Sequence, residues 1–455
     1  MIMIPVEKYE NQMLGDLLEL MRFESVKAEG EPGMPYGEGC FRALEFMLNR
    51  AKSMGFEVKN LEGHMGVVYY GDGEETLAIL SHLDVVPAGE GWETNPFEPV
   101  VKDGKIIGRG AVDDKGGAIS SLYALYAVKE AGIKLNKKIK LFFGCDEESG
   151  WGDIDYFKAH YPDPEYVITP DAGFPMINRE KGLLHILLKA RGESAGVIKN
   201  ICSGSRPNIV PNKAKCVLAG VYDINEKDAL PAKLTVNVKN KETELFCEGK
   251  ASHGSHPEEG INALMYLLKA VKGAGLDGRN AADRIASCLI KLIGNEIDGA
   301  SLGIKQKDEL VGELTVNVGA MEGDALCACA KIDIRTPIET DLEELFNTLK
   351  YKFAIYGIEC ENMHMQNSHY VDENSFIVRK LKEAYEICFN EKCECLPCAG
   401  ATYARAFKTG VAFGPCAIDA DRGEHGPNEF IYVEELNRLA RALFTAMVKA
   451  AGDEI

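Results

Sequence analysis

The hydrophobic pattern of the first 180 residues alternates between helical and strand-like segments. Residues about 8–24 and 39–54 have the spacing of amphipathic helices, and residues 119–131 place apolar side chains on one helical face. Short apolar runs, typical of buried strands, lie between these segments at 77–81, 138–144 and 166–169. Strands that alternate with helices predict an α/β fold, with a mainly parallel sheet flanked by helices.

The pattern changes after about Gly182. Helical residues 261–271 lie among strand-like stretches at 183–190, 232–238 and 313–318, and two helices follow at about 374–389 and 433–451. We therefore expect a discontinuous core domain, interrupted by an inserted α+β domain. The predicted boundaries are 1–182 and 371–455 for the core domain and 183–370 for the insert.

Length and charge narrow the class of protein. A chain of 455 residues is long enough for two or more domains, and 46% hydrophobic with 27% charged residues is typical of a globular protein. Lys and Arg total 51 against 70 Asp and Glu, so the formal charge is −19. This balance argues against nucleic acid or an anionic membrane as a partner.

We expect neither a secretory signal nor a membrane-spanning segment. Residues 1–5 run directly into charged residues, and no apolar stretch is long enough to cross a membrane. The 14 cysteines therefore indicate reduced thiols in a cytoplasmic protein. Cys393, Cys395 and Cys398 could form a metal knuckle, but a second Cys/His pair at zinc-finger spacing is missing.

Acidic and imidazole side chains follow three of the predicted strands. His82 and Asp84 end the first strand, Glu147 and Glu148 follow the second, and Asp171 follows the third. Between the first two strands, a glycine-rich loop that contains Asp113 opens a helix. In an open parallel sheet, ligands bind at the carboxyl ends of the strands.

Any one of these clusters alone is typical of a solvated turn or a helix cap. Together, however, crowded carboxylates raise one another's pKa unless a cation lies among them. Mixed imidazole and carboxylate ligands suit zinc, and also manganese or cobalt. Asp84 lies two residues after His82 and could accept its second ring N–H, while the adjacent Glu147 and Glu148 diverge, so that one can bind metal and the other can act as a base.

The combined motifs resemble the co-catalytic metallopeptidases related to aminoacylase and glutamate carboxypeptidase, and more narrowly the bacterial Xaa-His dipeptidases (peptidase V, carnosinase-like). The resemblance rests on His82-x-Asp84, Gly-Arg-Gly-x-x-Asp113-Asp114-Lys-Gly, Asp146-Glu147-Glu148-Ser149 and Pro170-Asp171, and it covers nearly the whole chain. It implies two divalent metal ions, Zn²⁺ first and Mn²⁺ or Co²⁺ as alternatives. The implied ligands are His82, Asp113, Glu148, Asp171 and His425.

The same resemblance assigns further roles. Asp113 would bridge the two ions and be followed by a cis peptide bond to Asp114, Asp84 would orient His82, and Glu147 would be the general base. The insert would be a lid that brings His253 to the oxyanion and Asn208 and Arg335 to the substrate. The loop with Gly400 and Thr402 would receive the substrate carboxylate, and Arg405 is an alternative for that role. The structural alternatives are a helix cap at His253 and a salt bridge within the lid at Arg335.

The resulting prediction is a metal-dependent dipeptidase that hydrolyses Xaa-His, β-Ala-Xaa or a broad range of dipeptides, with a water shared by the two ions and Glu147 as base. One alternative is a deacylase of N-acyl amino acids on the same scaffold. Another is a non-catalytic amino-acid or peptide-binding module, which predicts a damaged metal shell, whereas all five ligand positions are intact. The expected partner is a small peptide, without nucleic acid or membrane, and the long lid favours a monomer.

Overall fold

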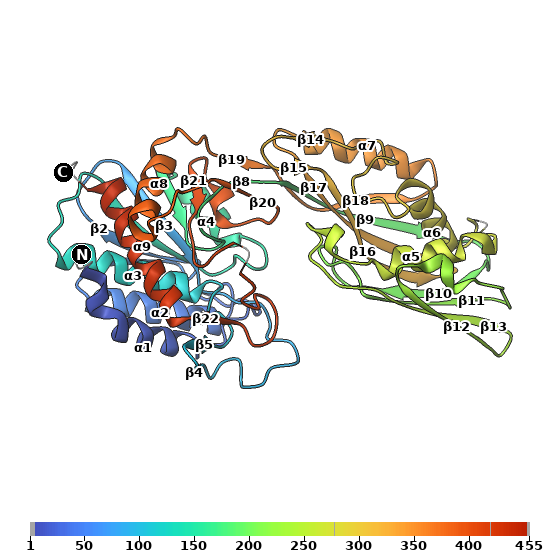
Figure 1. Ribbon diagram of the computed structural model, residues 1–455, viewed down its shortest axis with the longest axis horizontal. Coiled ribbons are helices and arrows are strands. Elements are labelled where there is room, and N and C mark those ends of the chain that lie inside the picture. The colour runs from blue at the N-terminus through green and yellow to red at the C-terminus, as the bar shows by residue number, and fades with distance from the viewer. Residues whose placement is uncertain (1–4, 277, 419, 453–455) are drawn as a thin grey trace. The chain divides into compact units, whose positions relative to one another are not determined.

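The computed structural model describes residues 5–276, 278–418 and 420–452, and within them the chain divides into two compact units (Figure 1). The first unit contains the described residues up to Arg179, Tyr370–Leu396 and those from Thr402 onward. The second contains Glu180–His369 and Pro397–Ala401. No helix in these described ranges is both long and apolar enough to span a bilayer.

The first unit is built around a mixed sheet with the strand order β1-β2-β6-β3-β7-β21-β8-β19, and β20 pairs with β8. Neighbours among β6, β3, β7 and β21 are parallel, whereas β1 and β2 pair antiparallel at one side. The strands are β1 (Glu57–Leu61), β2 (Met65–Tyr70), β3 (Thr76–His82), β6 (Lys138–Gly144), β7 (Tyr166–Thr169), β8 (Ile177–Glu180), β19 (His369–Tyr370), β20 (Leu396–Cys398) and β21 (Gly410–Ala412). A separate small sheet joins β4 (Val100–Lys102), β5 (Lys105–Ile107) and β22 (Phe430–Tyr432).

Helices cover both faces of this mixed sheet. On one face a large apolar core contains residues of α1 (Glu10–Leu20), α2 (Glu38–Ser53), α3 (Lys115–Glu130), α8 (Phe376–Phe389) and α9 (Val433–Ala451). On the other face, α4 (Gly152–His160) and the 3₁₀ turn Tyr403–Ala406 pack with Leu80, Phe142 and Val167. The predicted α/β class is therefore confirmed.

Most of the predicted segments appear at the predicted places. The strands at 138–144 and 166–169 and the helix predicted at about 433–451 appear with these bounds, because each is a largely apolar or strongly amphipathic run between turn residues. The helix predicted at 119–131 differs, since α3 begins at Lys115 and is buried almost all round. It packs against β3 on one side and against α1 and α9 on the others. The helix therefore buries nearly its whole circumference, whereas the sequence predicted one apolar face.

The second unit is an antiparallel sheet with the order β12-β13-β11-β10-β16-β17-β9-β18 and three helices beside it within the described residues. The strands are β9 (Gly182–Arg191), β10 (Ile198–Ser203), β11 (Lys213–Leu218), β12 (Lys233–Lys239), β13 (Glu242–Glu248), β16 (Thr315–Asp324), β17 (Cys327–Thr336) and β18 (Glu359–Gln366), with a short hairpin of β14 (Lys307–Asp308) and β15 (Gly312–Glu313). The helices are α5 (Ala263–Val271), α6 (Ala281–Leu292) and α7 (Leu342–Ala354). Their apolar residues share one core with alternate strand residues such as Leu184, Ile186 and Leu188.

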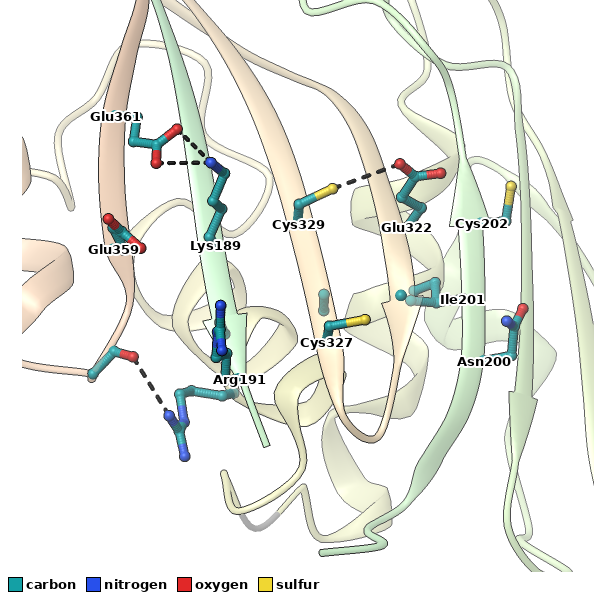
Figure 2. Close-up of a pocket in the computed structure, with 15 residues that line it drawn as sticks. Lys189, Arg191, Asn200, Ile201, Cys202, Glu322, Cys327, Cys329, Glu359 and Glu361 are labelled. Atoms are coloured by element: carbon teal, nitrogen blue, oxygen red, sulfur yellow. Dashed lines mark hydrogen bonds and ion pairs between the residues drawn. The ribbon is translucent and has the colours of Figure 1, made fainter. Parts of the chain in front are cut away.

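The opposite face of the second sheet is polar (Figure 2). Lys189 on β9 pairs with Glu361 on β18 at 2.6 Å, and the thiol of Cys329 lies 3.7 Å from Glu322 on the neighbouring strand. Apolar residues facing α5 to α7 alternate with polar residues on this face, which explains the period-2 pattern of the insert.

The residues Pro397–Ala401 belong to the second unit, although they were predicted to belong to the core domain. The backbone N–H of Lys181 donates to the carbonyl of Cys398 at 3.0 Å, and Arg335 Nη1 donates to the carbonyl of Ala399 at 2.7 Å. These contacts hold the segment against the second sheet. They join residues far apart in sequence, so the local sequence pattern does not predict them.

Candidate metal centre

The parallel register of the first sheet brings the predicted ligands to one edge. His82 is the last residue of β3 and is paired with Gly144, the last residue of β6, so the segment with Glu148 begins directly beside it. β7 runs parallel to β3 on the other side and ends two residues before Asp171. Because the carboxyl ends of parallel strands meet at one edge, three distant segments converge there.

His82 lies at the buried end of this cluster, with 0% of its surface exposed. Its Nε2 is 3.0 Å from Oδ1 of Asp113 and 3.6 Å from Oδ2 of Asp171. Its other ring nitrogen, Nδ1, is 2.9 Å from the backbone carbonyl of Asp84. A ring held in this way at Nδ1 presents Nε2 to the two carboxylates.

Asp113 occupies the centre of the cluster. Its Oδ1 faces His82, whereas its Oδ2 lies 3.1 Å from Nε2 of His425, which is also 3.1 Å from Oε2 of Glu148. Asp113 is followed by a cis peptide bond to Asp114, as the resemblance implied. The two oxygens of one carboxylate thus face two different imidazoles.

Two groups of potential ligands result, and they share Asp113. The first contains His82, Asp113 and Asp171, the second Asp113, Glu148 and His425, and within each group the ligand atoms lie within 4.8 Å of one another. The buried Nε2 of His82 faces two carboxylate oxygens, as expected for an imidazole nitrogen that shares a cation with carboxylate ligands. The donor set therefore fits two divalent ions.

The metal knuckle considered for the cysteine cluster at 393–398 does not gain such support. Among the residues that the structure describes, neither of the two ligand groups contains a thiol from the cluster Cys393, Cys395 and Cys398. Cys393 and Cys395 are buried in the apolar core of the first unit.

Asp84 contacts both His82 and the turn after β6, and its role in orienting His82 stays a prediction. Its Oδ1 lies 3.5 Å from Nδ1 of His82, and its backbone carbonyl lies 2.9 Å from the same nitrogen. Its carboxylate also accepts the backbone N–H groups of Glu147 at 3.1 Å and Glu148 at 3.0 Å. The turn after β6 directs both of these N–H groups toward the carboxylate of Asp84. Asp84 thereby fixes the turn that carries both glutamates.

The pKa values of the buried carboxyl groups show that nearby positive charge would stabilise their ionised forms. Burial, together with the negative charge of Asp113, raises the pKa of Glu148 to about 7. Burial also raises the pKa of Glu147 well above its usual value. For Asp113, burial acts in the same direction, but hydrogen bonds from His425 and His82 outweigh it and hold the pKa well below the usual range. A cation among these oxygens would supply the same stabilisation as the imidazole protons.

In the second unit, the segments that carry the predicted substrate residues Asn208 and His253 lie side by side. The N–H of Gly254 donates to the carbonyl of Asn208 at 2.7 Å, and Ile209 forms a β-bridge with His253. The His253 side chain is exposed, and its Nδ1 lies 2.6 Å from the hydroxyl of Ser255. This hydrogen bond orients the ring of His253.

Arg335 is buried, with 4% of its surface exposed, and makes the salt bridge named as its structural alternative. Its Nε and Nη2 donate to the two oxygens of Asp333 at 2.8 and 3.1 Å. It also holds the Ala399 carbonyl, next to Gly400. A substrate contact by Arg335 stays a prediction.

The remaining predicted substrate residues lie in one short segment. Gly400 belongs to the second unit, and its N–H lies 3.2 Å from the sulfur of Cys398. Thr402 belongs to the first unit, where its hydroxyl caps the 3₁₀ turn by accepting the N–H of Ala404. Arg405 is part of that turn and is half-buried. Their substrate roles stay predictions.

Sequence reasoning missed several carboxylates that support the site. Asp153 accepts the N–H groups of Cys145 and Asp146 at 2.7 and 3.0 Å and the hydroxyl of the buried Tyr403. Asp114 accepts the N–H of His82 at 3.2 Å. Asp114 stood within the quoted motif and could have been noticed, whereas the contact between Asp153 and Tyr403 spans 250 residues and leaves no local signal.

Comparisons with known proteins found a matching family and named relatives. Residues 78–449 match the family described as Peptidase family M20/M25/M40. A Bacillus subtilis (strain 168) protein named "Putative dipeptidase YtjP" is 32% identical over 454 residues, covering 96% of both chains. A Staphylococcus aureus (strain bovine RF122 / ET3-1) relative with a dipeptidase name of the same kind is 35% identical over 451 residues, covering 95% of both.

Solved structures share the fold at low sequence identity. The di-peptidase Dug1p from Saccharomyces cerevisiae has a TM-score of 0.63 at 14% identity, with 98% of this chain and 97% of that chain covered. The aminoacylhistidine dipeptidase from Vibrio alginolyticus has a TM-score of 0.60 at 14% identity, with 97% of both chains covered. These similarities extend over both units of the chain.

Proposed function

The chain belongs to peptidase family M20/M25/M40, and from that premise we propose that it hydrolyses dipeptides with two divalent metal ions and Glu147 as the general base. The family match confirms the resemblance and the enzyme class predicted from the sequence, a hydrolase of the metallopeptidase type. The dipeptide preference is supported by the names of relatives that match along nearly their whole length.

One observation carries the proposal: the carboxylate of Asp113 lies between two imidazoles, with His82 on one oxygen and His425 on the other. In this arrangement Asp113 would be shared by two ions, one held together with His82 and Asp171 and the other with Glu148 and His425. When bound, the two ions would acidify a water molecule and polarise the scissile carbonyl. Zn²⁺ is the first choice for this donor set, with Mn²⁺ and Co²⁺ as alternatives.

The proton transfers fall to Glu147. Its backbone N–H is held by Asp84, and the side chain is half-buried among His82, Asp171 and Glu148. A carboxylate here would accept the proton of the attacking water on one Oε atom and return it to the nitrogen of the leaving amine. Glu148, whose Oε2 faces His425, is left to hold metal.

We infer that His253 donates a hydrogen bond to the oxyanion that forms on the substrate. Replacing His253 with alanine is expected to lower kcat by about 10²–10³-fold, the usual effect of losing one oxyanion donor, without changing the bound metal. Steady-state kinetics with metal analysis would measure both quantities. His256 is the matched control, because it is exposed in the same loop and its side chain pairs with Glu258, so His256→Ala should retain activity. A loss of metal in His253→Ala would contradict the oxyanion role.

A substrate panel tests the proposed function directly. After chelator stripping, the protein would be supplied separately with Zn²⁺, Mn²⁺ and Co²⁺ and given β-alanyl-histidine, Leu-Leu, N-acetyl amino acids and N-succinyl amino acids. We expect dipeptide hydrolysis that depends on added metal and is absent from a Glu147→Gln preparation, which controls for contaminating peptidases. Preferential hydrolysis of the N-acyl substrates would identify a deacylase, and no hydrolysis by a metal-loaded protein would favour a binding module. Action as a monomer in the cytoplasm stays a prediction from the sequence.

A further inference from the structure

Glu429 takes no part in the proposed chemistry, yet its fully buried carboxylate holds the loop that carries Asp113. Its Oε2 accepts Nη1 of Arg109 at 2.8 Å and the N–H of Gly110 at 3.0 Å. Its Oε1 accepts the N–H groups of Val112 at 3.0 Å and Asp113 at 3.2 Å. Four donors from one five-residue stretch therefore converge on a single side chain.

The backbone of Glu429 extends the same connection. Its carbonyl accepts the N–H of Gly108 at 2.9 Å, and the next residue, Phe430, pairs with Ile107 in the β22–β5 ladder. The segment that contains His425, four residues earlier, is thus anchored along the loop that contains the central aspartate. Two ligand-bearing segments that are more than 300 residues apart in sequence are joined at this one position.

Arg109 adds a third loop and balances the charge of Glu429. It is 1% exposed, its guanidinium lies 5.3 Å from the ring of Trp92, and its Nη2 is 3.4 Å from the carbonyl oxygens of Pro87 and Ala88. The ion pair with Glu429 is fully removed from solvent. A buried carboxylate that is paired with Arg and accepts three backbone N–H groups is a rigid fixture.

We propose that Glu429 is a positioning residue of the metal centre, which keeps Asp113 and His425 at the mutual distance needed to hold one cation. The inference rests on the proposed metal-dependent function. Metal ligands must be held within about 0.5 Å of their working positions, and Asp113 follows a glycine-rich loop that cannot rigidify itself. The position requires a carboxylate rather than an amide, because the NH₂ group of a glutamine would face two N–H donors.

The test compares Glu429→Gln with the wild-type protein and with Asp283→Asn. Asp283 is a matched control in the second unit, since it is equally buried and accepts the N–H groups of Val197 at 2.9 Å and Ile198 at 2.8 Å. Affinity of the stripped proteins for Zn²⁺ would be measured by competition with a chromogenic chelator, together with thermal unfolding of the metal-free forms and kcat and KM for a dipeptide. Glu429→Asp, which keeps the charge but shortens the reach, provides a second variant if the glutamine variant does not fold.

We expect Glu429→Gln to bind Zn²⁺ about 10–100-fold more weakly and to lose kcat with little change in KM, the usual effect of removing a group that orients metal ligands. Glu429→Asp should lie between it and the wild type, and Asp283→Asn should lose thermal stability alone. Unchanged zinc affinity and kcat in the glutamate variants, with only lower thermal stability, would overturn the proposal. A wild-type protein that binds no metal would instead overturn the proposed function.

Discussion

Replacing Glu147 with glutamine is expected to lower kcat for dipeptide hydrolysis by about 10²–10⁴-fold, the contribution typical of a general base, while the bound metal stays unchanged. The amide has nearly the shape of the carboxylate but cannot accept the proton of the attacking water. The turn should persist, because Asp84 holds the backbone N–H groups of residues 147 and 148 and not the side chain of Glu147. Steady-state kinetics and metal analysis of the same preparation would check both parts.

Glu148→Gln is the matched comparison. The two glutamates are adjacent in sequence, but Glu148 contacts the predicted metal ligand His425, whereas Glu147 is the proposed base. Glu148 Oε2 lies 3.1 Å from Nε2 of His425 within one of the two ligand groups. Its replacement should therefore weaken metal binding, whereas that of Glu147 should not. Near-normal turnover by Glu147→Gln, or loss of metal from that variant, would refute its assignment as the base.

Replacing Asp113 with alanine is expected to remove most of the protein's capacity for divalent metal and to abolish hydrolysis. Asp113 belongs to both ligand groups, so one substitution damages both. A metal present at 100 times its Kd stabilises a protein by about 2.7 kcal/mol per site, and this gain on metal addition should largely disappear in the variant. Thermal unfolding with and without Zn²⁺, together with metal analysis, would measure it.

The metal-free Asp113→Ala protein should not be much less stable than the metal-free wild type. Removing one carboxylate relieves repulsion with Glu148 and Asp171, which offsets the lost hydrogen bonds from His82 and His425. Asp155→Ala, at an exposed position on α4, is the control and should keep the metal response. Two tightly bound ions in Asp113→Ala would contradict the proposal that this carboxylate is shared.

The contrast between local and distant contacts explains which parts of the site could be predicted. His82, Asp113, Glu148 and Asp171 each follow a strand or open a helix, so the hydrophobic pattern and the rule for parallel sheets already placed them at one edge. His425 lies in an irregular loop after β21, and its assignment came from the resemblance alone. The structure then brought its Nε2 to 3.1 Å from Asp113.

The sequence alone determined the α/β class, most of the helices and strands, and the metallopeptidase family, because these depend on local periodicity and on short motifs with fixed spacing. Only the tertiary structure decided which acceptor each buried donor finds. It assigned the Asp84 carboxylate to the turn of Glu147 and Glu148, and Glu429 to the loop of Asp113. Such pairings join segments up to about 320 residues apart, and they arise because a buried N–H must be satisfied by whichever acceptor folding brings near it.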